Sequence, residues 1–180
     1  MREPDPRTIA AASRGDTDAF EDIVRRCQAD VWRLARFLMR DETSADDVCQ
    51  ETFVRVFRFL PRFKRQSSFS TWLFSITRNC ARDALRAAGR NAEVVDRLKG
   101  VMDTRPAFPR SDLVDIKDAI LGLPLELREP LVLVDMFETP YHEVGAILDI
   151  PVGTVKSRVF KARRILIEVL GDADSMESSS

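Results

Sequence analysis

Apolar residues recur at spacings of three and four along most of the chain, as they do in amphipathic helices. The longest such run, residues 17–40, has its apolar positions at Phe20, Ile23, Val24, Cys27, Val31, Leu34, Ala35 and Leu38. The same spacing predicts helices over residues 6–13 and 44–60 and after Ser67 or Ser68, and further helices that begin at Ser111, Pro124, Pro140 and Pro151. We therefore expect an all-α fold.

Short polar side chains before these runs are expected to cap the helices by accepting hydrogen bonds from their first backbone N–H groups. The expected caps are Asp16 or Thr17, Thr43 or Ser44, Ser67 or Ser68, and Thr139. The boundary at residues 41–47, DETSADD, also places acids in the first turn, where the helix dipole favours them.

A helix-turn-helix is predicted near the end of the chain. Pro140 suits the first position of one helix, where its missing N–H costs nothing, and Pro151 starts the next. Asp149 and Ile150 form the tight turn between them, and Ala146 is the small residue expected at the helix contact.

A change in composition divides the chain. Residues 87–111 hold two glycines and two prolines and lack a sustained period, which is typical of a linker. We expect two small helical domains at residues 1–90 and 111–171, joined by a flexible linker at 91–110 and followed by a disordered, acidic, serine-rich tail at 172–180.

Arginine and aromatic residues are concentrated together between positions 53 and 90. The basic residues there are Arg55, Arg58, Arg62, Lys64, Arg65, Arg78, Arg82, Arg86 and Arg90, against the single acid Asp83. Positive charge follows phosphates, and flat rings can stack on unpaired bases, so the stretch is a candidate site for single-stranded nucleic acid. Most of its rings, Trp72 among them, have the spacing of core residues instead.

Three predicted helices have polar faces that could bind partners. The outer face of the third helix carries Asp47, Gln50, Glu51, Val54 and Arg58 and is either solvated or a docking surface. The fourth carries Thr71, Ser75, Arg78, Asn79, Arg82 and Arg86, which suits a phosphate clamp with one hydrogen-bonding reader. The helix from Pro151 carries Thr154, Ser157, Arg158, Lys161 and Arg164, which suit base edges and phosphates in a major groove.

Several classes of function lack support in the sequence. The three cysteines, Cys27, Cys49 and Cys80, are far apart and predict neither a disulfide framework nor a metal site. The single histidine, His142, has no catalytic partner pattern around it, so we expect no enzyme, no cofactor and no small-molecule substrate. The chain holds no apolar run of about 18 residues, so we expect no membrane insertion and a cytoplasmic location.

Three runs of sequence together resemble one family. They are DDVCQETFVRVFR at 46–58, FSTWLFSITRNCARDALR at 69–86 and YHEVGAILDIPVGTVKSRVFKARRIL at 141–166. In this order and spacing they resemble the bacterial extracytoplasmic-function sigma factors that have only sigma regions 2 and 4. The resemblance implies a subunit that binds core RNA polymerase and promoter DNA, and it implies regulation by an anti-sigma factor.

The resemblance also implies roles for particular residues. The D-D-x-x-Q-E-x-F pattern, which docks on the β′ clamp helices of polymerase, falls on Asp46, Asp47, Gln50, Glu51 and Phe53. The site for a flipped base of the minus-ten element and the strand beside it falls on Phe63, Lys64, Ser67, Ser68, Arg78, Asn79, Arg82, Asp83 and Arg86. The helix from Pro151 would read the minus-thirty-five element, and the domain that contains it would meet the β flap.

Two positions depart from the family pattern. The loop reads KRQSSF where an acid or glycine often precedes the serines, and Asp149 stands where glycine is common. The alternative function is a free-standing helix-turn-helix regulator. It would leave the basic-aromatic stretch and the DDVCQETF helix unexplained.

Overall fold

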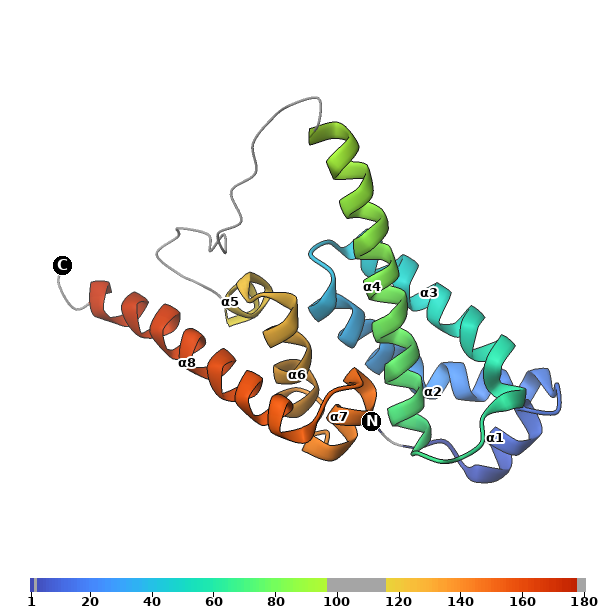
Figure 1. The fold of residues 1–180 in the computed structure, drawn as a ribbon. Coiled ribbons are helices and arrows are strands. Elements are labelled where there is room, and N and C mark those ends of the chain that lie inside the picture. Colours follow the sequence, from blue (N-terminus) through green and yellow to red (C-terminus); the bar gives the residue numbers. More distant parts are fainter. Residues whose placement is uncertain (2, 97–115, 178–180) are drawn as a thin grey trace. The chain divides into compact units, whose positions relative to one another are not determined.

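The structure is a computed structural model that describes residues 1, 3–96 and 116–177 (Figure 1). All regular secondary structure in these residues is α-helical or 3-10 helical, which confirms the all-α prediction. The chain divides after Asn91 into two compact units, and each is described by itself below.

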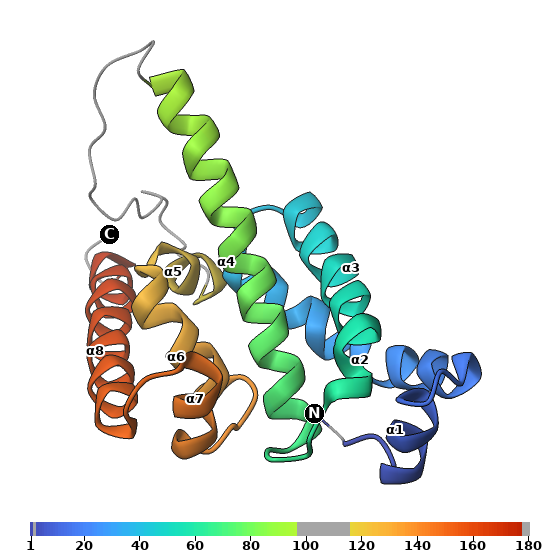
Figure 2. The ribbon, with the colours of Figure 1, turned by 45° about the vertical axis from the view of Figure 1, so that its right-hand side comes forward.

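The first unit contains four α-helices and one short 3-10 turn. The helices are α1 (Pro6–Ala12), α2 (Thr17–Leu38), α3 (Glu42–Phe59) and α4 (Phe69–Asp96), and the 3-10 turn η1 is Leu60–Arg62. Helices α1 and α3 pack against α2, and the long α4 runs alongside α2 and α3 in both views (Figures 1 and 2). Helix α4 extends to Asp96, further than the sequence predicts.

One apolar cluster holds the first unit together. It takes residues from every helix: Ile9, Ala12, Ile23, Cys27, Val31, Val56, Leu60, Phe69 and Leu73. These are the positions that the helical spacing selects, because a helix in a small domain must bury one face to be stable. Burial also raises the pKa of the Cys27 thiol to about 12, so this cysteine is an inert core residue at neutral pH.

The helix starts in this unit are capped as expected at two of three places. Asp16 accepts a hydrogen bond from the Ala19 N–H at 3.0 Å and caps α2. Ser68 accepts one from the Thr71 N–H at 3.1 Å at the start of α4. The prediction of Thr43 or Ser44 at α3 is wrong: the cap is Asp41, which accepts from the Ser44 N–H at 2.8 Å.

The placement of Thr71 on the polar face of α4 is also wrong. The residue is buried, with a 5 % exposed fraction. Its hydroxyl lies 2.7 Å from the Ser68 hydroxyl in the capping network, so burial leaves this group hydrogen-bonded.

The second unit contains α5 (Ile116–Gly122), α6 (Leu125–Asp135), α7 (Tyr141–Leu148) and α8 (Val152–Glu177). Helices α5, α6 and α7 all pack against α8 (Figure 1). Helix α8 extends to Glu177, further than the sequence predicts, and the expected helix start at Ser111 lies outside the described residues. Pro130 lies inside α6 and does not mark its start.

The core of the second unit consists of apolar side chains from all four helices. Its buried members are Ala119, Ile120, Leu123, Leu127, Leu131, Val132, Leu133, Phe137, Val144, Ile147, Leu148, Val155, Val159 and Ala162. The buried Arg128 donates to the carbonyl oxygen of Leu123 at 2.8 Å, which satisfies a backbone acceptor just after α5.

Helices α7 and α8 form the predicted helix-turn-helix, with two differences in detail. The N-cap of α7 is Pro140, one residue later than the predicted Thr139, and no side chain supplies a capping hydrogen bond. Ala146 is exposed, and the small residue at the contact is Gly145. Asp149 adopts the left-handed conformation, with φ 54° and ψ 50°, which explains why glycine suits this position.

Gly145→Ala is expected to destabilise the second unit by about 1–3 kcal/mol. A Cβ at this position would lie 3.0 Å from the backbone oxygen of Ile150, so the backbone of the turn between α7 and α8 would have to shift to accommodate it. The measurement is thermal unfolding by circular dichroism.

Gly153→Ala is the matched control, because a Cβ there meets nothing within 4 Å. It removes a glycine from a helix and should stabilise α8 by roughly 0.5–1 kcal/mol. Equal unfolding temperatures for the two variants would contradict the assignment of Gly145 to the helix contact.

Candidate nucleic-acid and partner interfaces

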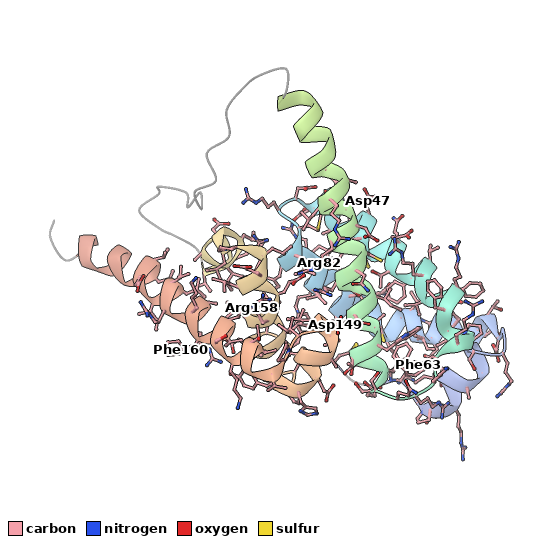
Figure 3. The ribbon with its side chains drawn as sticks, in the orientation of Figure 1. Asp47, Phe63, Arg82, Asp149, Arg158 and Phe160 are labelled. Carbon is pink, nitrogen blue, oxygen red and sulfur yellow. The ribbon has the colours of Figure 1, made fainter. Side chains whose placement is uncertain are left out.

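The outer face of α3 is exposed as predicted. Asp47, which Figure 3 labels, is exposed, as are Gln50, Glu51 and Val54. Val54 retains a 54 % exposed fraction. Phe53 is half-buried and packs against the core cluster of the first unit. The structure therefore brings two acids, an amide and an apolar side chain together on one face.

An apolar groove adjoins this face, between α2 and α3. It is lined by Phe20, Val24, Gln28, Cys49, Gln50, Phe53, Val54 and Phe57. The rings of Phe20 and Phe57 meet edge to face with centroids 5.0 Å apart, yet Phe57 keeps a 52 % exposed fraction. The sequence did not reveal this groove, because it depends on residues of α2 that the helical spacing assigns to the core.

Asp46, near the beginning of α3, is hydrogen-bonded to α2. Its carboxylate accepts a hydrogen bond from the Trp32 indole N–H at 2.7 Å. The guanidinium of Arg36 lies 5.8 Å from the centre of the Trp32 ring and pairs with Glu42 at 3.0 Å. These contacts fix the beginning of α3 against the end of α2.

A chain of charged groups connects the outer face of α3 with α4. Arg55 donates to Glu51 at 2.7 Å and to Asp83 at 2.8 Å, and Asp83 also lies 3.5 Å from Arg86. The two carboxylates raise the pKa of Arg55 above its ordinary value, chiefly through these hydrogen bonds. Asp83, which the resemblance placed in the DNA site, therefore forms ion pairs with two arginines in this structure.

The predicted basic face of α4 is present. Asn79 and Arg86 are exposed, and Arg78 and Arg82 are half-buried on the same stretch of helix, where Figure 3 labels Arg82. Ser75 is half-buried there and donates to the Trp72 carbonyl at 2.7 Å. An amide with both donor and acceptor capacity therefore lies among three guanidinium groups.

The loop between η1 and α4 contains one packed residue and several exposed ones. The ring of Phe63 contacts Trp72 and Phe69, with centroids 4.8 and 5.8 Å apart, so it belongs to the rim of the core (Figure 3). Trp72 packs on Phe69 as well, at 5.6 Å, as its spacing predicts. Lys64 and Ser67 are exposed, and Ser68 caps α4.

The outer face of α8 carries the predicted basic and hydroxyl residues. Ser157, Lys161 and Arg164 are exposed, whereas Thr154 and Arg158 are half-buried. Phe160 lies on the same face with a 65 % exposed fraction, and it was not among the residues predicted for this face (Figure 3). The sequence carries a signal for it, because an aromatic residue at this position lies outside the buried stripe of Val155, Val159 and Ala162.

One basic residue of α8 is engaged elsewhere. Arg163 forms a two-pronged pair with Asp135 of α6, and its Nε lies 3.1 Å from one carboxylate oxygen. The hydrogen bonds that Arg163 donates to the Asp135 carboxylate raise the pKa of its guanidinium. This arginine therefore joins two helices of the second unit.

The described part of the chain contains no group of three or more His, Cys, Asp or Glu side chains that could hold a metal ion. None of the described helices is long and apolar enough to cross a membrane.

A helical unit with an arginine-rich face and a second unit built on a helix-turn-helix define a two-domain DNA-binding protein, and comparison with known proteins gives its family. The model of Sigma-70 region 2 matches residues 23–91, and that of Sigma-70 region 4 matches residues 113–166. The chain belongs to the extracytoplasmic-function (ECF) RNA polymerase sigma factors, which are not enzymes.

Relatives and solved structures agree with this membership. The ECF sigma factor SigC of Mycobacterium tuberculosis is 36% identical over 160 residues, covering 87% of this chain and 86% of that protein. The sigma-H factor of Pseudomonas aeruginosa is 31% identical over 183 residues, covering 94% and 95%. The solved structure of the sigma factor RpoE of Bartonella quintana with the anti-sigma factor NepR is also similar. Its TM-score is 0.70 and its identity 29%, over 84% of this chain and 96% of that chain.

CnrH, solved in complex with the cytosolic domain of CnrY, is also similar. Its TM-score is 0.65 and its identity 29%, over 92% of this chain and 96% of that chain. The chain is accordingly a sigma factor that directs RNA polymerase to promoters, and a free-standing regulator is not favoured.

Proposed function

We propose that the two units divide the work of promoter opening. Residues 1–90 would bind core polymerase and open the minus-ten element, and residues 111–171 would read the minus-thirty-five element. The observation that carries this division is that distinct polar faces lie on α3 and α4 in the first unit and on α8 in the second.

Polymerase docking would use the outer face of α3 together with the adjoining groove. Asp47, Gln50 and Glu51 supply charge and hydrogen bonds, and the exposed Val54 and Phe57 supply apolar area beside them. Such a combination of an apolar centre and a polar rim is what specific protein interfaces need. The β′ clamp helices of core polymerase are the expected partner of this face, and the β flap that of the second unit.

Strand opening would use α4 and the loop before it. Arg78, Arg82 and Arg86 would hold phosphates of the non-template strand, and Asn79 would hydrogen-bond a base flipped toward Lys64, Ser67 and Ser68. Extruding one base costs a few kcal/mol, which these contacts would offset.

Regulation would come from a protein partner. The similar sigma factor RpoE was solved with the anti-sigma factor NepR, and the similar protein CnrH was solved with the cytosolic domain of CnrY. We expect an anti-sigma factor for this chain as well, and we place the chain in the cytoplasm, where polymerase and promoter DNA are found.

The test of polymerase docking is a Gln50→Ala, Glu51→Arg double variant. It reverses one exposed charge and removes one amide on the outer face of α3, so we expect core binding to weaken by roughly tenfold or more. The measurement is the affinity for purified core polymerase, with circular dichroism to verify the helical fold.

Asp22→Arg is the matched control, because Asp22 also pairs with an arginine four residues on, at 2.8 Å, but its spacing from Val24 and Gln28 puts it on another face of α2. It should bind core polymerase like the parent. Undiminished core binding by the folded double variant would remove α3 from the docking surface.

A further inference from the structure

The segment before α1 lies against the start of α4, more than sixty positions along the chain (Figures 1 and 2). The carboxylate of Glu3 accepts hydrogen bonds from the backbone N–H groups of Phe69, at 3.1 Å, and Ser70, at 2.8 Å. A residue distant in sequence therefore caps the helix that carries the predicted DNA-binding face.

Glu3 completes the capping of α4. The first backbone N–H groups of a helix have no partner inside the helix. The N–H of Thr71 is satisfied by the Ser68 hydroxyl at 3.1 Å, and that of Trp72 by the Ser68 carbonyl at 3.2 Å. With Glu3 on Phe69 and Ser70, all four groups are hydrogen-bonded, and a negative charge faces the positive end of the helix dipole.

A second contact ties the same segment to the loop before α4. Arg65 donates from Nη2 to the carbonyl oxygen of Pro6 at 3.0 Å. Arg65 also has a φ of 54°, the left-handed region that a residue with a side chain adopts only at a cost. The loop thus holds a strained conformation that a contact to the chain start helps to maintain.

Two further residues of this segment are packed in the first unit. Pro4 is buried, and Met1 is partly buried against the core cluster of the first unit. Lys64, Gln66 and Ser67, in contrast, remain exposed in the loop. The contacts of Glu3 and Arg65 use backbone groups, so they fix the loop and leave these side chains open to a ligand.

We propose that Glu3 and Arg65 are positioning residues of the strand-capture site, holding the loop at 63–68 in the shape that receives an unpaired base. The inference rests on the proposed role of that loop in strand opening. A loop that is already ordered has less conformational freedom to lose when it encloses a base, so capture is tighter and faster.

The test uses holoenzyme assembled from core polymerase and Glu3→Ala, Glu3→Gln or the parent chain. The readout is the affinity for a single-stranded non-template oligonucleotide that carries the minus-ten element. Without the Glu3 cap the loop must become ordered when it encloses the base, so Glu3→Ala should bind the oligonucleotide roughly fivefold more weakly. Glu3→Gln keeps one oxygen acceptor and should recover part of the affinity.

Arg65→Lys and Asp18→Ala complete the set. Arg65→Lys keeps the charge but lacks the guanidinium that reaches Pro6, so it should lose affinity as Glu3→Ala does. Asp18 is an exposed acid in the first turn of α2, and its replacement should leave the affinity unchanged. Core binding measured in parallel separates a displaced loop from a misfolded domain, since only misfolding weakens both.

Two results for Glu3→Ala would overturn the proposal. Tighter oligonucleotide binding would show that the carboxylate excludes the strand. Unchanged binding would show that the cap is irrelevant to capture. Should Glu3→Ala lose core binding as well, Glu3→Gln must show the loss of oligonucleotide affinity with intact core binding, or the proposal fails. Asn79→Ala distinguishes failure of this inference from failure of the proposed strand-opening function. If Asn79→Ala also leaves oligonucleotide binding unchanged, the proposed capture function is itself wrong.

Discussion

An Arg158→Ala, Lys161→Ala double variant is expected to bind promoter DNA in holoenzyme at least about thirtyfold more weakly than the parent chain, because each lost contact to a base or phosphate costs about 1–3 kcal/mol. Lys161 is exposed and Arg158 half-buried on the outer face of α8. If a contact is to phosphate, the loss also reduces the salt dependence of binding by about one unit of slope for each contact. The measurement is promoter affinity over a range of salt concentrations.

Arg163→Ala is the control for this experiment. It removes one positive charge from the same helix, where the double variant removes two. Because the Arg163 guanidinium is engaged with Asp135, promoter affinity should stay close to that of the parent. If the double variant transcribes like the parent at every salt concentration, α8 does not read the minus-thirty-five element.

Asn79→Ala is expected to slow promoter opening roughly tenfold on duplex DNA and to have a smaller effect on a template with a pre-melted bubble. Only the duplex must still be unpaired. Loss of the hydrogen bond to the flipped base removes about 1–3 kcal/mol of the binding energy that offsets the cost of extruding this base. Arg82→Ala should impair both templates, because a phosphate contact is needed on either one. The measurement is the permanganate reactivity of unpaired thymines.

Ser75→Ala is a suitable control for the same helix. The Ser75 hydroxyl donates to a backbone carbonyl of its own helix, so its removal should leave opening unchanged on both templates. If Asn79→Ala opens duplex DNA at the parent rate and with unchanged base preference, this face of α4 is an ordinary solvated surface.

Helical spacing predicted most of the fold because every helix in these small units buries one face. The apolar positions chosen in residues 17–40 include Ile23, Cys27, Val31, Leu34 and Leu38, which are all buried in α2. The exposed residues of the outer face of α3 follow from the same rule, since a face that avoids the core must meet solvent or a partner.

Helical spacing did not predict details that depend on specific hydrogen bonds or on the position of the backbone. Thr71 is polar but buried, because Ser68 satisfies its hydroxyl. Gly145 and Ala146 are adjacent small residues, and only the backbone position of Ile150 decides which one lies at the contact.

Contacts between distant segments could not be predicted either. No local pattern signals that Glu3 caps α4 or that Arg55 joins Glu51 to Asp83 across two helices. The second of these connections places the proposed polymerase face and the proposed DNA face within one charged network. A sequence motif gives the residues of each face separately, whereas the link between them appears only in the folded chain.

Transcription from promoters by purified components shows whether this chain acts as a sigma factor. The chain is mixed with core polymerase and a library of promoter fragments, and specific run-off transcripts are measured beside the binding of the chain alone to the same duplexes. We expect promoter-specific transcripts only when the chain and core polymerase are both present, and weak duplex binding by the chain alone. Tight binding of the free chain to a duplex operator, with no specific transcript in the presence of core polymerase, would contradict this expectation.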